Sequence, residues 1–493
     1  MKKSFVLSYD LGTSGVKAAL VTIHGEVTSA RTVAYPLFTP ENGWAEQDPA
    51  DYWSGICHVT REILESIGND CTCIKGIASG TQWKGIIPVD SQGCVLHRSI
   101  IWLDRRAKDQ EAFLRKQFGE FSGLDYMAKL MWLKENKPEI IEKAALILDA
   151  NSYLKWKLTG KTATDIGNCF VHSFDLELDQ LYKKALKHAE ISEDKFPKLV
   201  KSQELVGYVT EQAALQLGLK PGTPVFGGCN DIQAMAIGAG CPEIGGAHIY
   251  LGSSGWTGYT VPHLPGKLIS SAFDEYRDVA TFGMKATGLS VNWVVHRLYA
   301  EELQQTGDKV FELLEHDVAQ IPAGSQGVLV TPWFYGDSPP LFGSDARGCF
   351  LNLGANHDRR HLARATLEGI CYHLKMRAMD AQEKYGYQAD DIYVTGGGTN
   401  NAVWMQMLAD IMEKNIHVPH GASHIGARGI AYCALVGLGY CEDYSDAAKN
   451  IKIKQSYKPQ PKCISVYRKN YNVFRHLYDI LKPVFHEMNH KED

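Results

Sequence analysis

A single carboxylate, Asp10, ends an apolar run and is followed at once by the small polar stretch Gly12-Thr13-Ser14-Gly15. An acid beside a turn of glycines and hydroxyl residues suits a metal-bound phosphate. The carboxylate can attract the cation, while backbone N–H groups and hydroxyls contact the phosphate oxygens. The same residue types also form ordinary β-hairpin turns after a strand. The stretch therefore predicts either a phosphate turn or a plain hairpin.

The pattern returns about half a chain later. The segment "AHIYLGSSGWTGYTV", which begins at Ala247, repeats the apolar strand, the Leu-Gly pair, the two hydroxyl residues and the closing glycine. Tyr250 stands where the first copy has Asp10, so only the first copy brings an acid toward a metal. Such an internal repeat indicates two related halves, each contributing one phosphate turn.

A second carboxylate, Asp231, follows a short apolar run and a Gly-Gly pair in "PVFGGCNDIQAMAIGAG". An acid at a strand end beside two glycines is open to substrate, and it suits a general base that takes a hydroxyl proton during phosphoryl transfer. The alternative is a helix N-cap. The small residues that continue the segment predict a helix able to pack closely against its neighbours.

Three glycines follow another strand pattern in "VTGGGTNNAVWMQMLADIM", which begins at Val394. Glycine lets the backbone approach a flat or charged ligand, and the N-terminus of the following helix adds positive potential. The spacing differs from the dinucleotide fingerprint. A P-loop is absent, since Lys155 occupies the upstream glycine position before Gly160-Lys161-Thr162.

Side chains that suit a polyhydroxylated ligand gather in the first half of the chain. Aromatic faces supply apolar contact, while amide, acid and guanidinium groups supply paired hydrogen bonds. These candidates are Gln82, Trp83, Lys84, Trp102, Asp104 and Arg105. Each of them is equally compatible with a place on the surface.

The elements that must position these residues alternate between short β-branched runs ending in glycine and longer helical patterns, which predicts an α/β fold. Helices are expected over 48–67, opened by Asp-Pro, and over 361–386, closed by glycine. A chain of 493 residues exceeds the size at which one core stops growing, so we expect two domains, 1–243 and 244–493.

The composition of the chain limits the classes of partner that it can bind. With a net charge of -5, the chain lacks the basic excess that nucleic acid or an anionic membrane would require. No run approaches the length of a membrane span, and the twelve scattered cysteines are typical of reduced thiols. We expect a cytoplasmic protein, with a homodimer as the default oligomeric state.

Taken together, these segments resemble the FGGY family of carbohydrate kinases, within the actin, hexokinase and Hsp70 superfamily. "DLGTSGVK" and "YLGSSG" are similar to its phosphate motifs, "GGCNDIQAMAIGAG" to its catalytic motif and "GGGTNNAVWMQMLAD" to its adenosine motif. "NGWAEQDPADYW", "KLMWLKENKPE" and "YLKWKLTGKTATD" resemble its intervening segments. The resemblance implies two ribonuclease-H-like, actin/hexokinase-type α/β domains with a cleft between them, sugar mainly on the first and ATP mainly on the second.

Roles follow by position from the same resemblance. Asp10 would orient Mg²⁺ through water, and Asp231 would deprotonate the sugar hydroxyl. The residues expected to contact ATP and its phosphates are Asp10, Gly12, Thr13, Ser14, Lys17, Gly252, Ser253, Gly397, Gly398 and Asn401. Those expected to contact the sugar are Gln82, Trp83, Lys84, Asp104, Arg105 and Asp231.

The implied reaction is ATP-dependent phosphorylation of a sugar hydroxyl, with a ketopentose such as xylulose as the leading substrate. Alternatives are a polyol, a hexulose or an aldonate such as gluconate, a non-catalytic sugar-binding relative, and an actin-like ATPase. Three departures from the family pattern bear on the choice: Trp83-Lys84 in place of Met-His, Ile232 after the acid, and Arg428 near the adenosine end. A lysine near the sugar favours a carboxylate substrate.

Overall fold

The computed structural model describes residues 4–266, 271–337, 343 and 345–489. The chain forms two compact units, each assembled from several segments. The first comprises Met1–Ile244, Thr260–Ala280 and His424–Ile451, and the second comprises Gly245–Tyr259, Thr281–Ser423 and Lys452–Asp493. Two segments from the second half of the chain thus belong spatially to the first unit. The boundary between 243 and 244 stays a prediction.

The first unit is built on a sheet with the order β11-β12-β5-β1-β2-β3, and β13 also pairs with β5. Its strands are β1 (Phe5–Leu11), β2 (Gly15–Thr22), β3 (Val27–Ala34), β5 (Ile74–Thr81), β11 (Leu205–Tyr208), β12 (Pro224–Phe226) and β13 (Cys229–Asn230). β1, β12 and β13 run parallel to β5, whereas β2 is antiparallel to β1. The carboxyl ends of β1, β5 and β13 therefore meet at one edge, the usual place for ligands in open α/β sheets.

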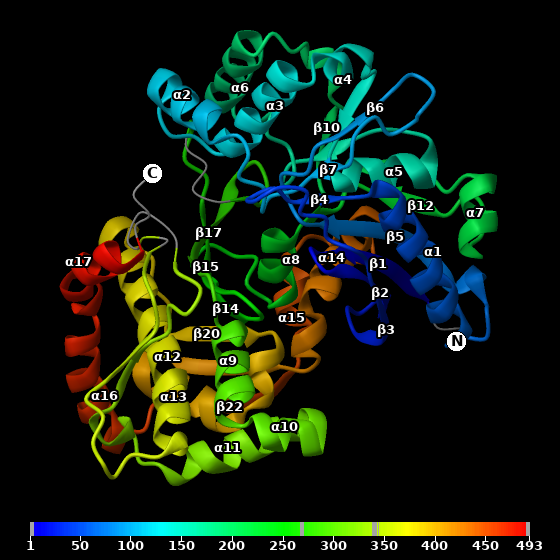
Figure 1. Cartoon of the computed structure of the whole chain (residues 1–493). Helices are drawn as coiled ribbons and strands as arrows, with labels where there is room; N and C mark the ends of the chain where they lie inside the picture. The colour runs from blue at the N-terminus through cyan, green and yellow to red at the C-terminus, as the bar shows by residue number, and fades with distance from the viewer. Residues whose placement is uncertain (1–3, 267–270, 338–342, 344, 490–493) are drawn as a thin grey trace. The chain divides into compact units, whose positions relative to one another are not determined.

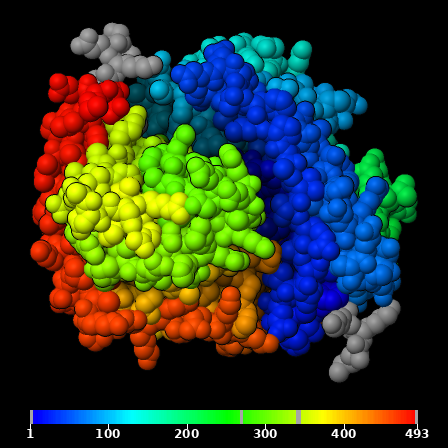
Figure 2. Space-filling model, turned by 60° about the horizontal axis from the view of Figure 1, so that its bottom comes forward, coloured from blue at the N-terminus to red at the C-terminus, as the bar shows by residue number. Residues whose placement is uncertain are grey.

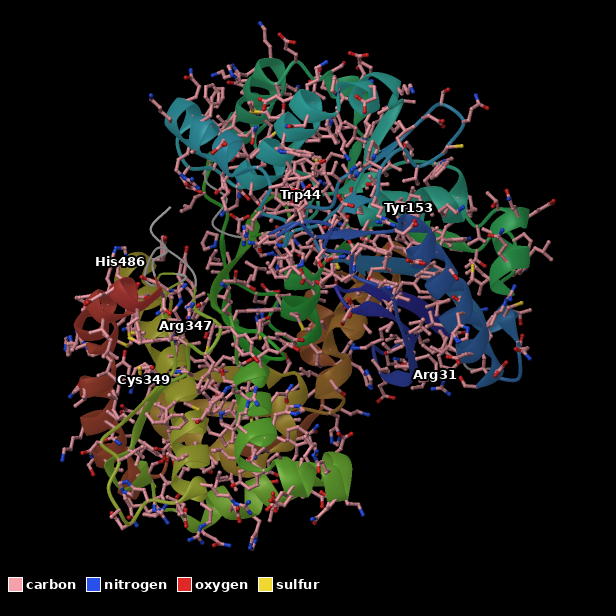
Figure 3. The ribbon with its side chains drawn as sticks, viewed as in Figure 1. Arg31, Trp44, Tyr153, Arg347, Cys349 and His486 are labelled. Atoms are coloured by element: carbon pink, nitrogen blue, oxygen red, sulfur yellow. The ribbon has the colours of Figure 1, made fainter. Side chains whose placement is uncertain are left out.

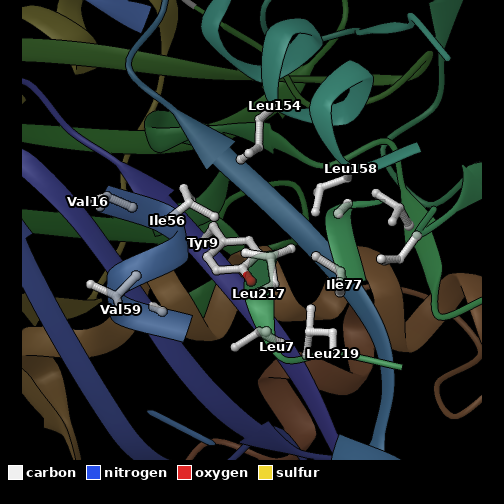
Figure 4. Packing of buried hydrophobic residues seen from close by; sticks show 14 of the residues in the cluster. Leu7, Tyr9, Val16, Ile56, Val59, Ile77, Leu154, Leu158, Leu217 and Leu219 are labelled. Carbon is white, nitrogen blue, oxygen red and sulfur yellow. The ribbon is translucent and has the colours of Figure 1, made fainter. Parts of the chain in front are cut away.

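The strand period of two gives each face of this sheet its own core. On β1, Leu7 and Tyr9 pack with Ile56 of helix α1 (Pro49–Glu65), as Figure 4 shows. Val6, which points to the other face, belongs to the cluster around Ile430 of α14 (Ile425–Gly437). Figure 1 shows α1 and α14 on opposite sides of β1 and β2.

The expected helices form, and their caps explain where they begin and end. Asp48 caps α1, accepting from the N–H of Ala50 at 2.9 Å, and a proline fills the first helical position. Helix α12 (Arg359–Tyr385) starts with a capping box on Asp358 and ends at Gly386 with φ 73°.

The small-residue helix expected after Asp231 is α8 (Asp231–Gly238), and it packs closely on α14. A Cβ added to Gly429 would lie 1.9 Å from the Ala234 carbonyl oxygen, and one on Gly238 would lie 2.0 Å from that of Ile425. Only glycine permits this approach of the two backbones. The prediction of close packing is confirmed, and it fixes the helix that carries Asp231.

Arg428, one of the departures noted in the sequence, is buried in the first unit. Its guanidinium donates to the carbonyl oxygens of Gly25 at 3.0 Å, Gly238 at 2.6 Å and Ala447 at 2.8 Å. The side chain therefore joins three separate segments through their buried backbone acceptors.

The second sheet has the order β16-β17-β15-β14-β20-β21-β22. Its strands are β14 (Ala247–Leu251), β15 (Gly255–Pro262), β16 (Ser271–Ala272), β17 (Arg277–Met284), β20 (Asp391–Thr395), β21 (Asn415–Pro419) and β22 (Ile453–Tyr457). β14 and β15 form an antiparallel hairpin like β1 and β2, while β14 and β20 run parallel. The repeat seen in the sequence is thus a repeated hairpin.

The remaining elements surround these sheets. In the first unit they are β4 (Glu46–Gln47), β6 (Ile87–Val89), β7 (Ser99–Ile100), β8 (Leu146–Leu148), β9 (Thr164–Asp165), β10 (Leu199–Val200), α2 (Lys108–Phe118), α3 (Leu124–Asn136), α4 (Pro138–Lys143), α5 (Ala150–Thr159), α6 (Leu176–His188), α7 (Glu211–Leu217) and α15 (Ser445–Lys449). In the second they are β18 (Leu329–Thr331), β19 (Cys349–Leu351), α9 (Gly288–Leu298), α10 (Ala300–Thr306), α11 (Val310–Gln320), α13 (Ala402–Met412), α16 (Pro461–Phe474) and α17 (Leu477–Asn489).

Helix α10 has no buried residue, and Figure 2 shows the green segment around residue 300 at the surface. Within the described ranges, none of the helices combines the length and the apolar character needed to cross a bilayer.

The contact between α8 and α14 can be tested by overpacking. We expect Gly429→Ala to lower the free energy of unfolding by about 1 to 3 kcal/mol, because the new methyl group would press on the Ala234 carbonyl oxygen. Urea denaturation measures this change. Gly283→Ala is the matched control, since its Cβ would meet only the Gly255 carbonyl oxygen at 4.0 Å. Equal stability of both variants would contradict the close packing.

Candidate active site

Three of the residues singled out in the sequence meet at one edge of the first sheet. Asp10 pairs with Gly80 in the parallel register of β1 and β5, and Asn230 pairs with Thr81. Gln82 directly follows Thr81, and Asp231 directly follows Asn230. The edge therefore gathers the metal-directed acid, the first sugar candidate and the expected base.

Asp231 occupies the first position of α8, but it is not the helix cap. Asn230 is the cap, and its side-chain oxygen accepts from the N–H of Gln233 at 2.8 Å. Asp231 accepts from the N–H of Ile232 at 3.0 Å. Burial, and then the negative charge of Asp10, raises the pKa of Asp231 to about 7. The alternative of an N-cap thus applies to Asn230, and Asp231 is left poised to exchange a proton near neutral pH.

The pKa of Asp10 depends on burial and on its neighbour across the hairpin. Burial raises its pKa, and the positive charge of Lys17, its cross-strand partner, lowers it. Gly426 of α14 faces the carboxylate, because a Cβ there would lie 3.5 Å from Asp10 Oδ2. The absence of a side chain at Gly426 keeps that side of the carboxylate free of a protein group.

The carbonyl oxygens of the first turn are all held by protein donors. Tyr35 donates its hydroxyl to the Gly12 carbonyl oxygen and its backbone N–H to that of Ser14 at 3.4 Å. Gln47 Nε2 donates to the Thr13 carbonyl oxygen at 2.6 Å. These bonds fix the turn and compensate the negative ends of its peptide dipoles.

The carbonyl oxygens of the second turn, which begins at Gly252, are also held by protein donors, but by different ones. Thr287 Oγ1 lies 2.8 Å from the carbonyl oxygen of Gly252 and 2.7 Å from that of Ser254, so its one proton is shared between them, and its N–H donates to the carbonyl oxygen of Ser253 at 3.1 Å. The N–H of Gly288, where α9 begins, adds a bond to Gly252 at 2.8 Å. Because a phosphate is repelled by open carbonyl oxygens and attracted by N–H groups, both turns suit anions.

A cavity of about 790 Å³ in the second unit collects the candidates from the second half of the chain. Its lining includes Gly252, Ser253, Gly397, Gly398 and Asn401. The parallel pairing of β14 with β20 explains this, since both glycine turns follow strands that end at the same edge. The size lies in the range of small-molecule sites.

The N-terminus of α13 differs from the expectation. Glu315 Oε1 accepts from the N–H groups of Ala402 at 2.7 Å and Val403 at 3.3 Å, and Asn401 caps Trp404 at 2.8 Å. A carboxylate already offsets the positive end of this helix, so less of the expected positive potential is left for a ligand. The glycines before α13 therefore suit an uncharged, flat group better than a phosphate.

Gln82 is joined to the phosphate turn by a hydrogen-bond network. Thr13 Oγ1 donates to Gln82 Oε1 at 3.1 Å, and Gln82 Nε2 donates to Gln47 Oε1 at 2.6 Å. Trp102 Nε1 donates to Thr13 Oγ1 at 3.0 Å. Residues expected on the sugar side and on the phosphate side thus share one network.

Asp104 is committed to protein groups. It accepts from the N–H of Ala45 at 2.6 Å and from Arg106 through the backbone N–H, Nε and Nη2 at 2.7 to 3.0 Å. The Arg106 guanidinium lies 3.8 Å from the ring centre of Trp44, which Figure 3 labels. Arg105 is exposed beside this pair. A direct sugar contact by Asp104 stays a prediction, while its bonds give it a positioning role.

Several site residues were not singled out from the sequence. Gln47 lies in "NGWAEQDPADYW", a segment that resembles one of the family, so its position could have been noticed. Tyr35, Thr287 and Glu315 are single residues without a motif around them. They reach the site only through the tertiary fold.

The raised pKa of Asp231 has a measurable consequence. We expect its carboxyl carbon to titrate near pH 7 in ¹³C NMR of the free protein, with Asp231→Asn identifying the signal. Since the folded pKa exceeds the unfolded value, ionising Asp231 lowers stability as the pH rises from about 4 to about 7. Asp231→Asn should therefore raise Tm more at pH 8 than at pH 5. A titration near pH 4 would contradict this.

Comparison with known proteins identifies the family of the chain. The model of the FGGY family of carbohydrate kinases, N-terminal domain, matches residues 5–238, and that of its C-terminal domain matches 249–438. The chain is 28% identical to a xylulose kinase of Bacillus subtilis, covering 97% of this chain and 98% of the relative. It is 25% identical to a gluconokinase of the same organism, covering 97% and 96%.

The fold is also found in solved structures. A gluconate kinase from Lactobacillus acidophilus superimposes with a TM-score of 0.86 at 22% identity, covering 99% of this chain and all of that one. The expected two-domain α/β fold is confirmed. The chain belongs to the FGGY family of carbohydrate kinases and is a sugar kinase.

Proposed function

We propose that this enzyme transfers the terminal phosphoryl group of Mg-ATP to a hydroxyl group of a ketopentose such as xylulose, with Asp231 as the general base. The observation that carries the proposal is the pKa of Asp231, which burial and Asp10 raise to about 7 at the sheet edge. A base with this pKa is half ionised at neutral pH and can take the proton that the acceptor hydroxyl loses.

The residues present fit Mg-ATP. Asp10 supplies one carboxylate for a hydrated Mg²⁺, and the turns that begin at Gly12 and Gly252 have their carbonyl oxygens compensated. The cavity that Gly397 and Gly398 line has room for a nucleoside, and the carboxylate of Glu315 favours an uncharged group there. When bound, Mg-ATP supplies the phosphoryl group and neutralises part of its charge.

The chain itself contributes positioning, charge and a proton acceptor. Thr13, held by Trp102 and Gln82, orients the first turn, and Thr287 orients the second. Asp231 Oδ atoms accept the proton of the substrate hydroxyl, which becomes the nucleophile as the proton leaves. Phosphoryl transfer rewards such fixed groups because little covalent chemistry falls to the protein.

The choice of a ketopentose rests on the full-length similarity to a xylulose kinase. An aldonate is the second candidate, supported by the similarity to a gluconokinase and by the cation Lys84 among the sugar candidates. A coupled ADP-release screen over pentuloses, hexuloses, polyols and aldonates, run with a no-sugar control, decides between them. ATP consumption that no sugar raises would contradict the kinase proposal.

Asp231→Asn tests the base directly. We expect kcat to fall by about 10²- to 10⁴-fold, the usual contribution of general base catalysis. Binding of sugar and nucleotide, measured by calorimetry, should change less than about threefold, because the amide keeps the shape of the carboxylate. If the variant turned over at a near-normal rate, Asp231 would not be the base.

Thr287→Val tests the second turn. Removing the hydroxyl breaks its bonds to the carbonyl oxygens of Gly252 and Ser254, so we expect KM for ATP to rise about tenfold. KM for the sugar should stay within about twofold, and Thr287→Ser, which keeps the hydroxyl, should restore ATP binding. A parallel rise in both KM values, or no rescue by serine, would argue against a role confined to the nucleotide.

A further inference from the structure

The second turn differs from the first at the residue that stands two positions before its first glycine. In the first hairpin Asp10 pairs with Lys17 across the strands, and in the second Tyr250 pairs with Trp256. Two aromatic rings thus replace an acid–lysine pair at the matching place in the repeat. A second carboxylate there would repel a phosphate, whereas a phenol is neutral and has one O–H donor.

The Tyr250 ring lies against the first glycine of this turn. A Cβ added to Gly252 would lie 2.2 Å from Tyr250 Oη and 2.4 Å from Cζ, so only glycine leaves room for the phenol. Tyr250, which is half-buried, lines the cavity of the second unit together with Gly252 and Ser253. The hydroxyl therefore lies beside the position at which the nucleotide phosphates are expected.

The backbone of the turn supplies fewer donors at this point than its glycines suggest. The N–H of Gly252 donates to the Ser254 carbonyl oxygen at 3.0 Å, within the turn itself. A phosphate oxygen beside Gly252 therefore needs a donor from a side chain. The Tyr250 hydroxyl is a donor of that kind, and the fold places it there.

Trp256 and His248 fix the position of the phenol. The ring centres of Tyr250 and Trp256 lie 4.4 Å apart, and Trp256 Nε1 donates to His248 Nε2 at 3.3 Å. Gly258 stands opposite His248 in the strand register and leaves room for the imidazole, since a Cβ there would lie 2.3 Å from its Cε1. These contacts restrict the positions that the Tyr250 ring can take.

Holding Trp256 in this way leaves a polar atom buried. His248 is fully buried, and burial lowers its pKa to about 4, so the imidazole is neutral near pH 7. Because Nε2 accepts from Trp256, the ring proton lies on Nδ1, which has no hydrogen-bond partner among the described residues. Such a group is unfavourable and calls for a reason, which the fixed aromatic pair provides.

We propose that Tyr250 is a further catalytic residue of this kinase, donating a hydrogen bond from its hydroxyl to the phosphoryl group during transfer. Trp256 and His248 are positioning residues that hold the phenol at the second turn. The O–H bond stays intact, so Tyr250 supplies a hydrogen bond and no proton. A donor that is fixed in advance stabilises the charge of the transition state without a cost of reorganisation. The inference rests on the proposed function and adds one neutral donor to it.

Tyr250→Phe removes the hydroxyl alone. With the best sugar of the ADP-release screen, we expect kcat to fall about 10- to 100-fold and KM for ATP to stay within about threefold, because the bond is strongest in the transition state. Tyr259→Phe is the matched control. Tyr259 lies on β15 of the same sheet and outside the described lining of the cavity, so its kcat should equal that of the wild type.

A second measurement needs no turnover. Calorimetry compares the binding of Mg-ADP with that of Mg-ADP plus aluminium fluoride, whose planar fluoride resembles the phosphoryl group in transit. Tyr250→Phe should weaken the fluoride complex about tenfold and leave Kd for Mg-ADP within about twofold. Equal losses for both ligands would show a merely structural role, and unchanged affinities with a near-normal kcat would exclude the contact. Either result overturns the inference.

Tyr250→Asp and Tyr250→Asn form a matched pair that tests where the phosphates lie. Both variants lose the ring, but only the aspartate adds a negative charge. In EDTA, where no cation can bridge the new carboxylate and a phosphate, ATP should bind the aspartate variant at least about tenfold more weakly than the asparagine variant. Equal affinities would place the phosphates elsewhere and overturn the inference. Silence of the wild type with every sugar would instead refute the proposed function, while both binding measurements would still decide the role of Tyr250.

Discussion

The compensation of carbonyl oxygens at two tight turns is the constraint on which the site depends. A hairpin turn exposes N–H and C=O groups within a few ångströms of each other, so it attracts an anion only when the carbonyl oxygens are engaged elsewhere. In the first hairpin Tyr35 and Gln47 engage them, and in the second Thr287 and Gly288 do so. Both halves meet one physical requirement with unrelated residues.

The acidic residues show how the two halves then diverge. Only the first turn has a carboxylate, Asp10, and the parallel pairing around β5 brings Asp231 to the same edge. Burial and the nearby charge of Asp10 raise the pKa of Asp231, which costs stability in the ionised form and gives the proposed base a pKa suited to neutral pH. This cost in stability arises at Asp231 itself, where the proposed proton transfer requires it.

The sequence predicted what depends on local pattern. The strands before each glycine turn, the hairpin repeat and the capped helices follow from periodicity, glycine and cap residues over a few positions. Thr287 and Glu315 could not be found this way, because their partners lie 33 to 35 and 87 to 88 positions distant along the chain. The sequence also could not show which arginine binds Asp104. Arg105 and Arg106 are adjacent, and only side-chain conformation and packing against Trp44 in the folded chain distinguish Arg106.

The acidic wall of the second-unit cavity would orient the proposed nucleotide. Asp308, Glu312 and Glu315 line it, and Glu315 already occupies the first N–H groups of α13. Phosphates are repelled from such a wall, whereas an uncharged base and ribose are not. The phosphates are therefore expected at Gly252 and Ser253, in the same cavity, where Thr287 has compensated the carbonyl oxygens. Repulsion at one side and compensated dipoles at the other would orient the proposed nucleotide without the lysine of a P-loop.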